Sequence, residues 1–399
     1  MRAGAFLAGS LVERCRRHSP PTGWHHQNAA IHACGPAEAV IEEVAGSWLK
    51  EVFGLPQGAS FAFVTGTQMA HLTCLAAARL RLLARAGWDV EEQGLTGAPA
   101  IRILTSTEPH GSIEWAIRML GFGKRAVTPL ASNNLGQLEP TALERALESH
   151  GQQPTIVVLH AGDLNIGAFD SFIDLIPIAR RHRCWVHVDG AFGLWVAASA
   201  KYPHLLGGVE LADSWTNDGH KWLNTPFDCG YAFVADAEAH RAAFAHRTSY
   251  TLFVDDARDQ IDWNPEWSRR GRGIPTYAAL RQLGRSGIAE LVERTCAHAR
   301  ALVMRIGRLA GAEVVWEPTI NQGLVRILDA RSGATEQDHD RRTDETIARI
   351  VASGEVFFGG TTWRGKRCMR VSVCNWQTCE ADVDRAVRAA QRVLGNVSP

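Results

Sequence analysis

A lysine, Lys221, stands in a part of the sequence whose composition a solvent-exposed lysine does not require. It follows His220 in the segment ADSWTNDGHKWLNTPFDCG, which is turn-forming around Asp218 and Gly219 and then runs into the apolar stretch CGYAFVAD. This pattern predicts that Lys221 lies at the edge of a strand, close to the interior. A lysine in such a position either extends its stem along apolar surface or uses its amine as a chemical group.

Three further groups of polar residues follow apolar, strand-like runs. Residues 65–68 (TGTQ) follow one run and open a helix-like one, so their backbone N–H groups and the helix dipole would converge on one point and could bind a phosphate. His110 follows the run IRILTS, and Asp189 ends the run CWVHVD just before the small residue Ala191. Taken one at a time, these residues are equally well explained by a turn, a helix start and a helix cap.

The elements that position these residues follow an alternating pattern of strands and helices. Amphipathic runs with apolar residues at three-to-four spacing separate the apolar runs, and this alternation predicts an α/β fold with a mostly parallel sheet covered by helices on both faces. In such sheets ligands gather at the carboxyl ends of the strands. The predicted strands of this part are 61–66, 101–106, 126–130, 155–162, 184–190 and 229–235.

A second domain is predicted after a long helical pattern at 277–309. Short strands within 314–318, 323–328, 355–360 and 369–375 indicate an α+β domain, and the polar stretch 331–345 is typical of a mobile loop. We therefore expect an N-terminal arm (1–45), a large domain (46–290) and a small C-terminal domain (291–399).

The composition favours a small-molecule partner. Of the 399 residues, 46% are hydrophobic, and Lys plus Arg equal Asp plus Glu at 42 each, so no attraction to nucleic acid or to an acidic membrane surface is expected. Charges interrupt every apolar stretch before it reaches membrane-spanning length and no cleavage site is convincing, which predicts a cytoplasmic protein. The nine scattered cysteines form no CxxC pair and indicate neither a disulfide framework nor a metal site.

Taken together, the candidate residues meet the requirements of pyridoxal 5′-phosphate. The aldehyde of this cofactor needs a lysine amine, its pyridine nitrogen needs a carboxylate in order to stay protonated, and its phosphate needs oriented donors. Lys221, Asp189 and residues 65–68 supply these groups at the ends of strands in one predicted sheet.

The order of the motifs resembles a known family. The order of the segments closely resembles that of the group II pyridoxal-phosphate-dependent amino acid decarboxylases, from about residue 35 to the last helix. The segments are VTGTQMAHLTCLAAAR, EPHGSIEWA, AGDLNIGAFD, WVHVDGAFG and DSWTNDGHKWLNTPFDCG. The resemblance implies fold type I, the aspartate aminotransferase fold, with a seven-stranded, mostly parallel sheet in the large domain. It also implies a homodimer with the active site at the interface.

The resemblance also implies a role for each motif residue. Lys221 would form the Schiff base with the cofactor, and decarboxylation would proceed through a quinonoid intermediate. His110 would stack on the cofactor ring, Asp189 would contact the pyridine nitrogen, and Ala191 would lie under the ring. The residues that would serve the phosphate are Gly66, Thr67, Gln68 and His220.

Several positions of this sequence match the pattern of the family only in part. Tyr250, in HRTSYTLFVDD, lies where the family has a mobile-loop tyrosine that acts after carbon dioxide leaves. Residues 163–164 stand where the family often has a pair of threonines, and Asp218 replaces another residue. We expect Asn165 to compensate by contributing to cofactor binding.

The reaction and the substrate depend on residues in late segments of the chain. Arg370 aligns with the arginine that clamps the α-carboxylate in aminotransferases of this fold, and a tight clamp would oppose loss of that carboxylate. Decarboxylation of an L-amino acid is the first interpretation, with transamination and retro-aldol cleavage as alternatives. Trp363 would favour an aromatic or bulky substrate, whereas Arg272 and Arg364 would favour an acidic one.

Overall fold

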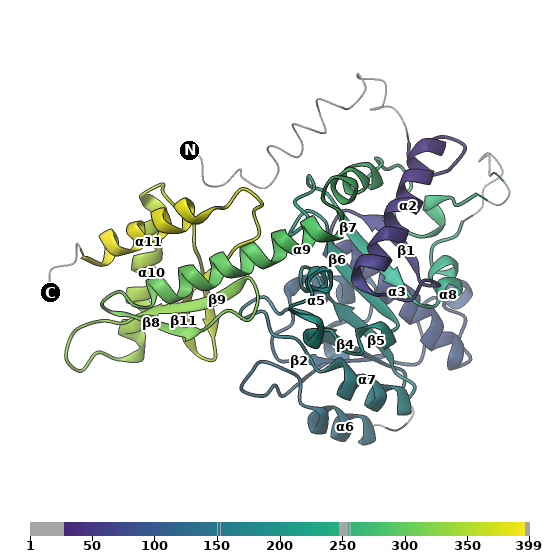
Figure 1. Cartoon of the computed structure of the whole chain (residues 1–399). Coiled ribbons are helices and arrows are strands. Elements are labelled where there is room, and N and C mark those ends of the chain that lie inside the picture. Colours follow the sequence, from purple (N-terminus) through teal and green to yellow (C-terminus); the bar gives the residue numbers. More distant parts are fainter. Residues whose placement is uncertain (1–27, 150, 152, 247–253, 255–256, 396–399) are drawn as a thin grey trace. The chain divides into compact units, whose positions relative to one another are not determined.

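The structure is a computed structural model that describes residues 28–149, 151, 153–246, 254 and 257–395 (Figure 1). The chain divides into two compact units, and each is described by itself. The larger unit contains residues 28–162 and 168–288, and the smaller one contains 163–167 and 289–395.

The larger unit is built on a seven-stranded sheet, which confirms the predicted fold class. Strands β2 to β6 pair in parallel, and β7 pairs antiparallel with both β6 and β1. In sheet order the strands are β1 (Ser60–Val64), β7 (Gly230–Val234), β6 (Ser214–Asp218), β5 (Trp185–Asp189), β4 (Thr155–His160), β2 (Arg102–Ser106) and β3 (Val127–Leu130). The sequence pattern missed β6, whose residues SWTND are mostly polar although all five are buried.

Helices connect and cover these strands. Helix α3 contacts β1, β5, β6 and β7, and its buried alanines and leucines share one apolar core with the strands. The α-helices of this unit are α2 (Pro36–Phe53), α3 (Thr67–Arg85), α4 (Val90–Gln93), α5 (Gly111–Met119), α6 (Pro140–Glu148), α7 (Phe172–Arg181), α8 (Ala237–Ala242) and the first part of α9 (Gly273–Ile306). Short 3-10 helices span Lys124–Ala126, Gly193–Ala198, Pro203–Leu205, Val209–Leu211 and Gln260–Asp262.

The directions of the strands bring several chain segments to one edge of the sheet. Because β1 and β6 are both antiparallel to β7, β1 runs in the same direction as β2 to β6. The carboxyl ends of β1, β2, β4, β5 and β6 therefore share an edge. The loop that leaves β6 starts at the same edge, and it carries His220 and Lys221.

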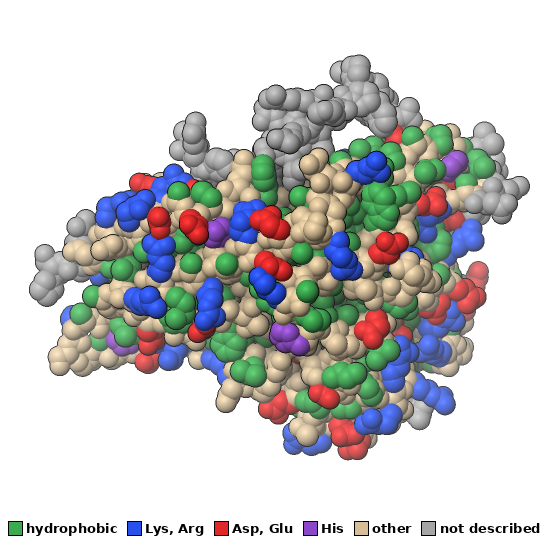
Figure 2. Space-filling model, viewed as in Figure 1, with side chains coloured by type: hydrophobic (Ala, Val, Ile, Leu, Met, Phe, Trp, Pro, Cys, Tyr) green, Lys and Arg blue, Asp and Glu red, His purple; other side chains and the backbone are tan. Residues whose placement is uncertain are grey.

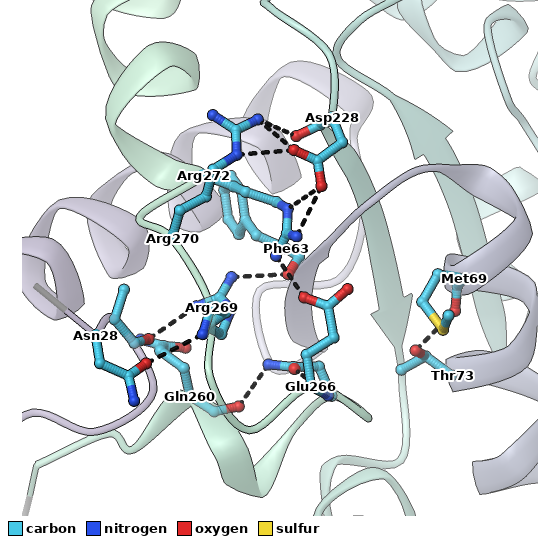
Figure 3. A network of polar contacts seen from close by, with 12 residues as sticks. Asn28, Phe63, Met69, Thr73, Asp228, Gln260, Glu266, Arg269, Arg270 and Arg272 are labelled. Atoms are coloured by element: carbon cyan, nitrogen blue, oxygen red, sulfur yellow. Dashed lines mark hydrogen bonds and ion pairs between the residues drawn. The ribbon is translucent and has the colours of Figure 1, made fainter. Parts of the chain in front are cut away.

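A network of arginines fastens the segment before α9 to the rest of the larger unit (Figure 3). The fully buried Arg269 forms an ion pair with Glu42 of α2 at 3.0 Å and donates to the carbonyl of Phe63 at 2.8 Å. Arg270 and Arg272 both bind Asp228, at the end of the loop that carries Lys221. The network thus fixes the far end of the lysine loop.

The smaller unit is an antiparallel sheet with helices. Its strands, in sheet order, are β10 (Gly359–Trp363), β11 (Lys366–Ser372), β9 (Gln322–Ile327) and β8 (Ala312–Trp316). Its helices are the last part of α9, α10 (Glu336–Ala352) and α11 (Glu380–Gly395).

Two expectations for the smaller unit were wrong. The polar stretch 331–345 is not a loop throughout, because a capping box between Thr335 and Asp338 starts α10. The predicted strand at 355–360 lies too early, since β10 begins at Gly359 and pairs with β11 after a hairpin turn.

Acidic and basic side chains are interspersed over the face drawn in Figure 2, as the balanced charge of the chain suggests. Within the described residues, no helix combines the length and the apolar character needed to cross a membrane.

Candidate active site

Lys221 lies in the turn that follows β6, with its side chain 38% exposed. Its Nζ is 3.0 Å from Oδ2 of Asp218, the last residue of β6, and 5.8 Å from the ring centroid of Phe192. Asp218 itself is buried. The amine is therefore held at the carboxyl edge of the sheet, between a buried carboxylate and an aromatic ring, and remains partly open to solvent.

Asp189 ends β5 and is buried at the same edge. Its Oδ1 accepts a hydrogen bond from the backbone N–H of Ala191 at 3.1 Å, and its Oδ2 lies 3.5 Å from Nε2 of His71. Burial alone would raise the pKa of this carboxyl, but His71, together with His160 and Lys221, holds the pKa well below its usual range. Asp189 is thus an anion inside the protein, suited to face a cationic ring.

The start of α3 forms the third part of the site. Gly66 is the N-cap and provides no side-chain cap, while the backbone N–H of Thr67 donates to Oδ1 of Asp218 at 2.7 Å. The hydroxyl of Thr67 is buried and has no hydrogen-bond partner among the described residues. Gln68 is exposed. An unpartnered hydroxyl at a helix N-terminus is a suitable donor for an anionic group.

His220 closes this end of the site. Its Nδ1 accepts the backbone N–H of Cys229 at 3.3 Å, and its Nε2 lies 3.6 Å from Oδ1 of Asp218. The ring stacks on Phe227 with centroids 4.2 Å apart. Burial lowers the pKa of His220, so the ring is neutral at pH 7 and, with Nδ1 accepting, carries its proton on Nε2. A Cβ on Gly66 would lie 3.1 Å from Cε1 of this ring, so the absence of a side chain at Gly66 favours the close approach.

His110 is exposed and caps α5, where its Nδ1 accepts the backbone N–H of Ser112 at 3.2 Å. Desolvation by the surrounding chain lowers the pKa of His110, the Asp189 carboxylate opposes that shift, and the charge of Lys221 adds to it. The imidazole therefore lies within electrostatic reach of both residues. A neutral, exposed ring at this position can stack on a flat ligand.

The other predicted site residues belong to the smaller unit. The amide oxygen of Asn165 accepts the hydroxyl of Thr361 at 2.6 Å, and Arg370 on β11 donates to the carbonyl of Leu164 at 3.2 Å. Trp363 is buried at the turn of the β10–β11 hairpin, where it pairs with Lys366.

Arg370 and Trp363 stand at different positions along the β10–β11 hairpin. Arg370 pairs with Gly359, four residues along β10 from Trp363, so the backbone positions of the two residues are roughly 13 Å apart. The two predicted substrate residues therefore lie at opposite ends of the paired part of this hairpin. Tyr250 lies outside the described residues.

Sequence reasoning missed two contacts at this edge. His71, which faces Asp189, went unremarked, although it lies four residues after Thr67 on α3 and thus on the same face of that helix. Asp218 was noted as a departure from the family pattern, but its pairing with Lys221 and Thr67 was not expected.

These residues fit pyridoxal 5′-phosphate. The site offers a partly exposed amine, a buried anion and an unpartnered hydroxyl at a helix start. One feature differs from an ideal phosphate site, because the Asp218 carboxylate accepts the Thr67 N–H that a phosphate would otherwise use. The described part of the chain contains no cluster of three or more His, Cys, Asp or Glu side chains able to hold a metal ion.

Comparison with known sequences agrees with this geometry. The sequence model of the pyridoxal-dependent decarboxylase conserved domain matches residues 26–326, well over half of the chain. The chain is 24% identical to an aromatic-L-amino-acid decarboxylase of Bacillus atrophaeus over 95% of its length and 76% of that protein. It is 28% identical to the acidic amino acid decarboxylase GADL1 of Mus musculus over 71% of its length, but it spans only 52% of that relative.

Solved structures share the fold. A tryptamine-bound structure of Oryza sativa TDC with PLP gives a TM-score of 0.88 at 22% identity, covering 97% of this chain and 81% of the other. Mouse CSAD gives 0.89 at 23% identity, covering 98% and 83%. At such low identity these structures confirm the fold, while the conserved-domain match is what assigns the family. The chain belongs to the pyridoxal-dependent decarboxylase family, and its cofactor is pyridoxal 5′-phosphate.

Proposed function

We propose that this chain removes the α-carboxyl group of an L-amino acid, with the cofactor held at Lys221. The observation that carries the proposal is the convergence of Lys221, Asp189 and the start of α3 on one edge of the sheet. The names of the relatives support the reaction class. They include decarboxylases of aromatic amino acids, of diaminobutyrate and of cysteine sulfinic acid, so they favour no single substrate.

The cofactor, when bound, supplies an aldehyde that bonds to an amine and a ring that accepts the electron pair left by the departing carboxyl group. Lys221 would hold the cofactor and yield its place to the amine of the substrate. Asp189 would keep a proton on the pyridine nitrogen, because its carboxylate is buried and its pKa is low. That proton makes the ring a better electron acceptor.

The remaining residues would orient the group. The neutral imidazole of His110 would lie against the ring, with Ala191 on the opposite side, and the start of α3 would hold the phosphate with Nε2–H of His220. The partner groups of His220 support this last role, since Cys229 fixes the tautomer that donates from Nε2. Holding the ring still lets the substrate present its α-carboxyl bond perpendicular to it.

Transamination is the second candidate, and it rests on Arg370. Burial lowers the pKa of this arginine, and one nitrogen of its guanidinium is bound to the carbonyl of Leu164. A guanidinium that is partly committed to the backbone is a weaker clamp for a carboxylate, which favours decarboxylation.

The substrate class is narrowed by Arg272. This arginine binds both Asp228 and Glu266, and its side chain is only 7% exposed, so it is not available to an acidic substrate. Arg364 lies over the ring of Trp363, 5.2 Å from its centroid. Arg272 is therefore excluded as the residue that would bind an acidic substrate.

We also propose a homodimer with the active site at its interface, in which Tyr250 supplies a proton after carbon dioxide leaves. The family resemblance supports both statements, and light scattering of the purified protein tests the first. The cytoplasmic location stays a prediction.

The reaction is tested with the purified protein, loaded with pyridoxal 5′-phosphate and incubated with a pool of amino acids, with and without an α-keto acid. Mass spectrometry follows carbon dioxide and amines. Carbon dioxide with a matching amine supports the proposal and identifies the substrate. A new amino acid that forms only with the keto acid would instead identify an aminotransferase. The variant Lys221→Ala is the control for background chemistry.

A further inference from the structure

A buried chain of polar groups extends from Asp189 into the core behind the site. His71 on α3 contacts His187 on β5, with its Nδ1 2.9 Å from Nε2 of His187. Nδ1 of His187 is in turn 2.8 Å from the hydroxyl of Ser214 on β6, and the indole N–H of Trp185 donates to the same hydroxyl at 2.9 Å. All four side chains are at most 1% exposed, so water does not compete for these bonds.

The Trp185 indole fixes the direction of the protons along this chain. An indole N–H only donates, so the Ser214 oxygen accepts from it and its own O–H is free to donate. The strongest acceptor next to that hydroxyl is Nδ1 of His187, which leaves the proton of His187 on Nε2. Burial holds the pKa of His187 well below its usual range, so this ring is neutral.

The position of the His187 proton in turn determines where His71 carries its proton. Because Nε2 of His187 donates to Nδ1 of His71, the proton of His71 lies on Nε2, the atom that faces Asp189 at 3.5 Å. Nε2 of His71 is buried and has no hydrogen-bond partner among the described residues. If Nδ1–H of His187 donated to Ser214 instead, the Ser214 O–H would have to donate to the sulfur of Cys74, which is a weak acceptor.

We propose that His71 is a positioning residue for Asp189: at the end of a relay anchored on Trp185, it presents an N–H to the carboxylate and keeps Asp189 ionised. The proposal rests on the proposed function, since the ionised Asp189 is what holds a proton on the pyridine nitrogen. Asp189 also faces His160 and Lys221, so His71 is not its sole charged or polar neighbour. His71 differs from these two in being fully buried and linked to the core.

The tautomers are measured first, on the cofactor-free protein labelled with ¹⁵N-histidine. Long-range ¹H–¹⁵N correlation spectra between pH 6 and 8 report which ring nitrogen carries the proton, and the His71 and His187 variants assign the signals. We expect His187 to be neutral with its proton on Nε2, and His71 to carry a proton on Nε2. A proton on Nδ1 of His187, or an Nε2 of His71 that carries no proton, overturns the relay. This result does not depend on any enzymatic activity.

The effect on the cofactor is measured with a matched pair of variants. The amide nitrogen of glutamine can occupy the place of imidazole Nε2, whereas asparagine reaches only the place of Nδ1. His71→Gln therefore keeps a donor toward Asp189, and His71→Asn removes it. The ¹⁵N signal of ring-labelled, bound pyridoxal 5′-phosphate reports the protonation of the ring. In His71→Asn we expect that equilibrium to shift about tenfold toward the unprotonated ring, and in His71→Gln to stay near that of the unchanged protein.

A control separates this role from a structural one. His240 is also a fully buried histidine, bonded to Ser60 at 2.8 Å and to the carbonyl of Trp263 at 2.7 Å, but it does not contact Asp189. We expect His240→Asn to lower the unfolding temperature without moving the cofactor signal. Equal shifts in both His71 variants, or in neither, refute the proposal. If the protein decarboxylates no amino acid but the tautomers are as expected, the proposed function fails and the relay stands.

Discussion

Two buried aspartates end neighbouring strands at the same edge of the sheet, and their surroundings differ. Asp189 on β5 meets a backbone N–H and the ring of His71. Asp218 on β6 is already paired with the ammonium of Lys221 at 3.0 Å and with the N–H of Thr67 at 2.7 Å. Asp189 is therefore supported by groups in the core and can still face a cation. Asp218 is instead bound to Lys221 and Thr67, two groups that the cofactor itself requires.

The comparison shows that equal residue types at similar strand positions acquire different roles from their neighbours. Around Asp189 the protein supplies the groups that keep a negative charge in place. Around Asp218 a carboxylate occupies the start of α3, where a phosphate would bind. We infer that the ring end of the site is preorganised, while the phosphate end must rearrange when the cofactor enters.

Loss of the lysine should have the largest effect, because Lys221 serves Asp218 and the cofactor alike. We expect Lys221→Ala to abolish the visible absorbance that remains after dialysis of the loaded protein and to lower turnover on the order of a thousandfold or more. Absorbance spectra and initial rates measure the two effects. Lys124→Ala, at an exposed position in a short helix, is the control. Retention of the bound absorbance in Lys221→Ala would sink the assignment of this residue.

Asp189→Asn should have the next largest effect and should leave the Asp218 end intact. Asparagine has nearly the same shape but no charge, so it cannot keep a proton on the pyridine nitrogen. We expect the cofactor to remain bound and turnover to fall roughly a hundredfold. Steady-state kinetics and an equilibrium measurement of cofactor binding test this expectation. Turnover close to that of the unchanged protein would mean that the ring is protonated by another group.

Much of the fold follows from the sequence because apolar strands leave a clear pattern. The runs around β1, β2, β4 and β5 are continuous and apolar, as expected for strands buried on both faces. Strand β6 was missed since its polar side chains bond inside the sheet, for example Asn217, whose amide donates to the carbonyl of Gly190 at 2.7 Å. A hydropathy pattern shows that these side chains are polar but does not reveal the hydrogen bonds that they form inside the sheet.

Helix α10 was missed for the opposite reason. Its surface is almost entirely polar, and only Thr343, Thr346 and Ile350 are buried. The capping box that starts it, Thr335 with Asp338, was present in the sequence as the signal TEQD. The local start signal was thus more informative here than the apolar periodicity.

The sequence predicted which strand ends contribute residues to the candidate site, but not which of these residues contact one another. The motif order led to Lys221, Asp189 and residues 65–68, which the structure gathers at one edge. Asp218 and Thr67 are 151 residues apart, and only the folded chain shows that they bond to each other. The same holds for His71 and Asp189, since no local pattern encodes which ring faces which carboxylate.

Asp218→Asn tests the phosphate end by producing two effects of opposite sign. Loss of the ion pair with Lys221 should lower the free energy of unfolding of the cofactor-free protein by about 1 kcal/mol, because Lys221 is partly exposed and screened by solvent. Loss of the negative charge next to the phosphate should strengthen binding of pyridoxal 5′-phosphate about tenfold. Denaturant unfolding and equilibrium binding measure these quantities.

The control for this variant is pyridoxal, which lacks the phosphate. Asp218 also holds Lys221, so an effect that acts through the lysine should change the affinity for pyridoxal as well, whereas the tenfold gain should be confined to the compound that carries the phosphate. Weaker binding of both compounds would show that Asp218 supports the phosphate end and does not compete with the cofactor. The two aspartates would then play similar supporting roles, and the contrast between them would be lost.

Gly66→Ala should have the smallest effect of these variants, and it also tests the phosphate end of the site. The backbone of Gly66 is extended, with φ 166°, so alanine introduces no strain there. The added Cβ would lie 3.1 Å from Cε1 of His220 and 3.5 Å from Oδ1 of Asp218, so the imidazole must shift slightly. We expect cofactor affinity to fall about threefold, equivalent to ~0.7 kcal/mol. In Gly58→Ala, where a Cβ would meet nothing within 4 Å, affinity should stay unchanged. Equal affinities in the two variants would show that His220 does not need its present position to hold the phosphate.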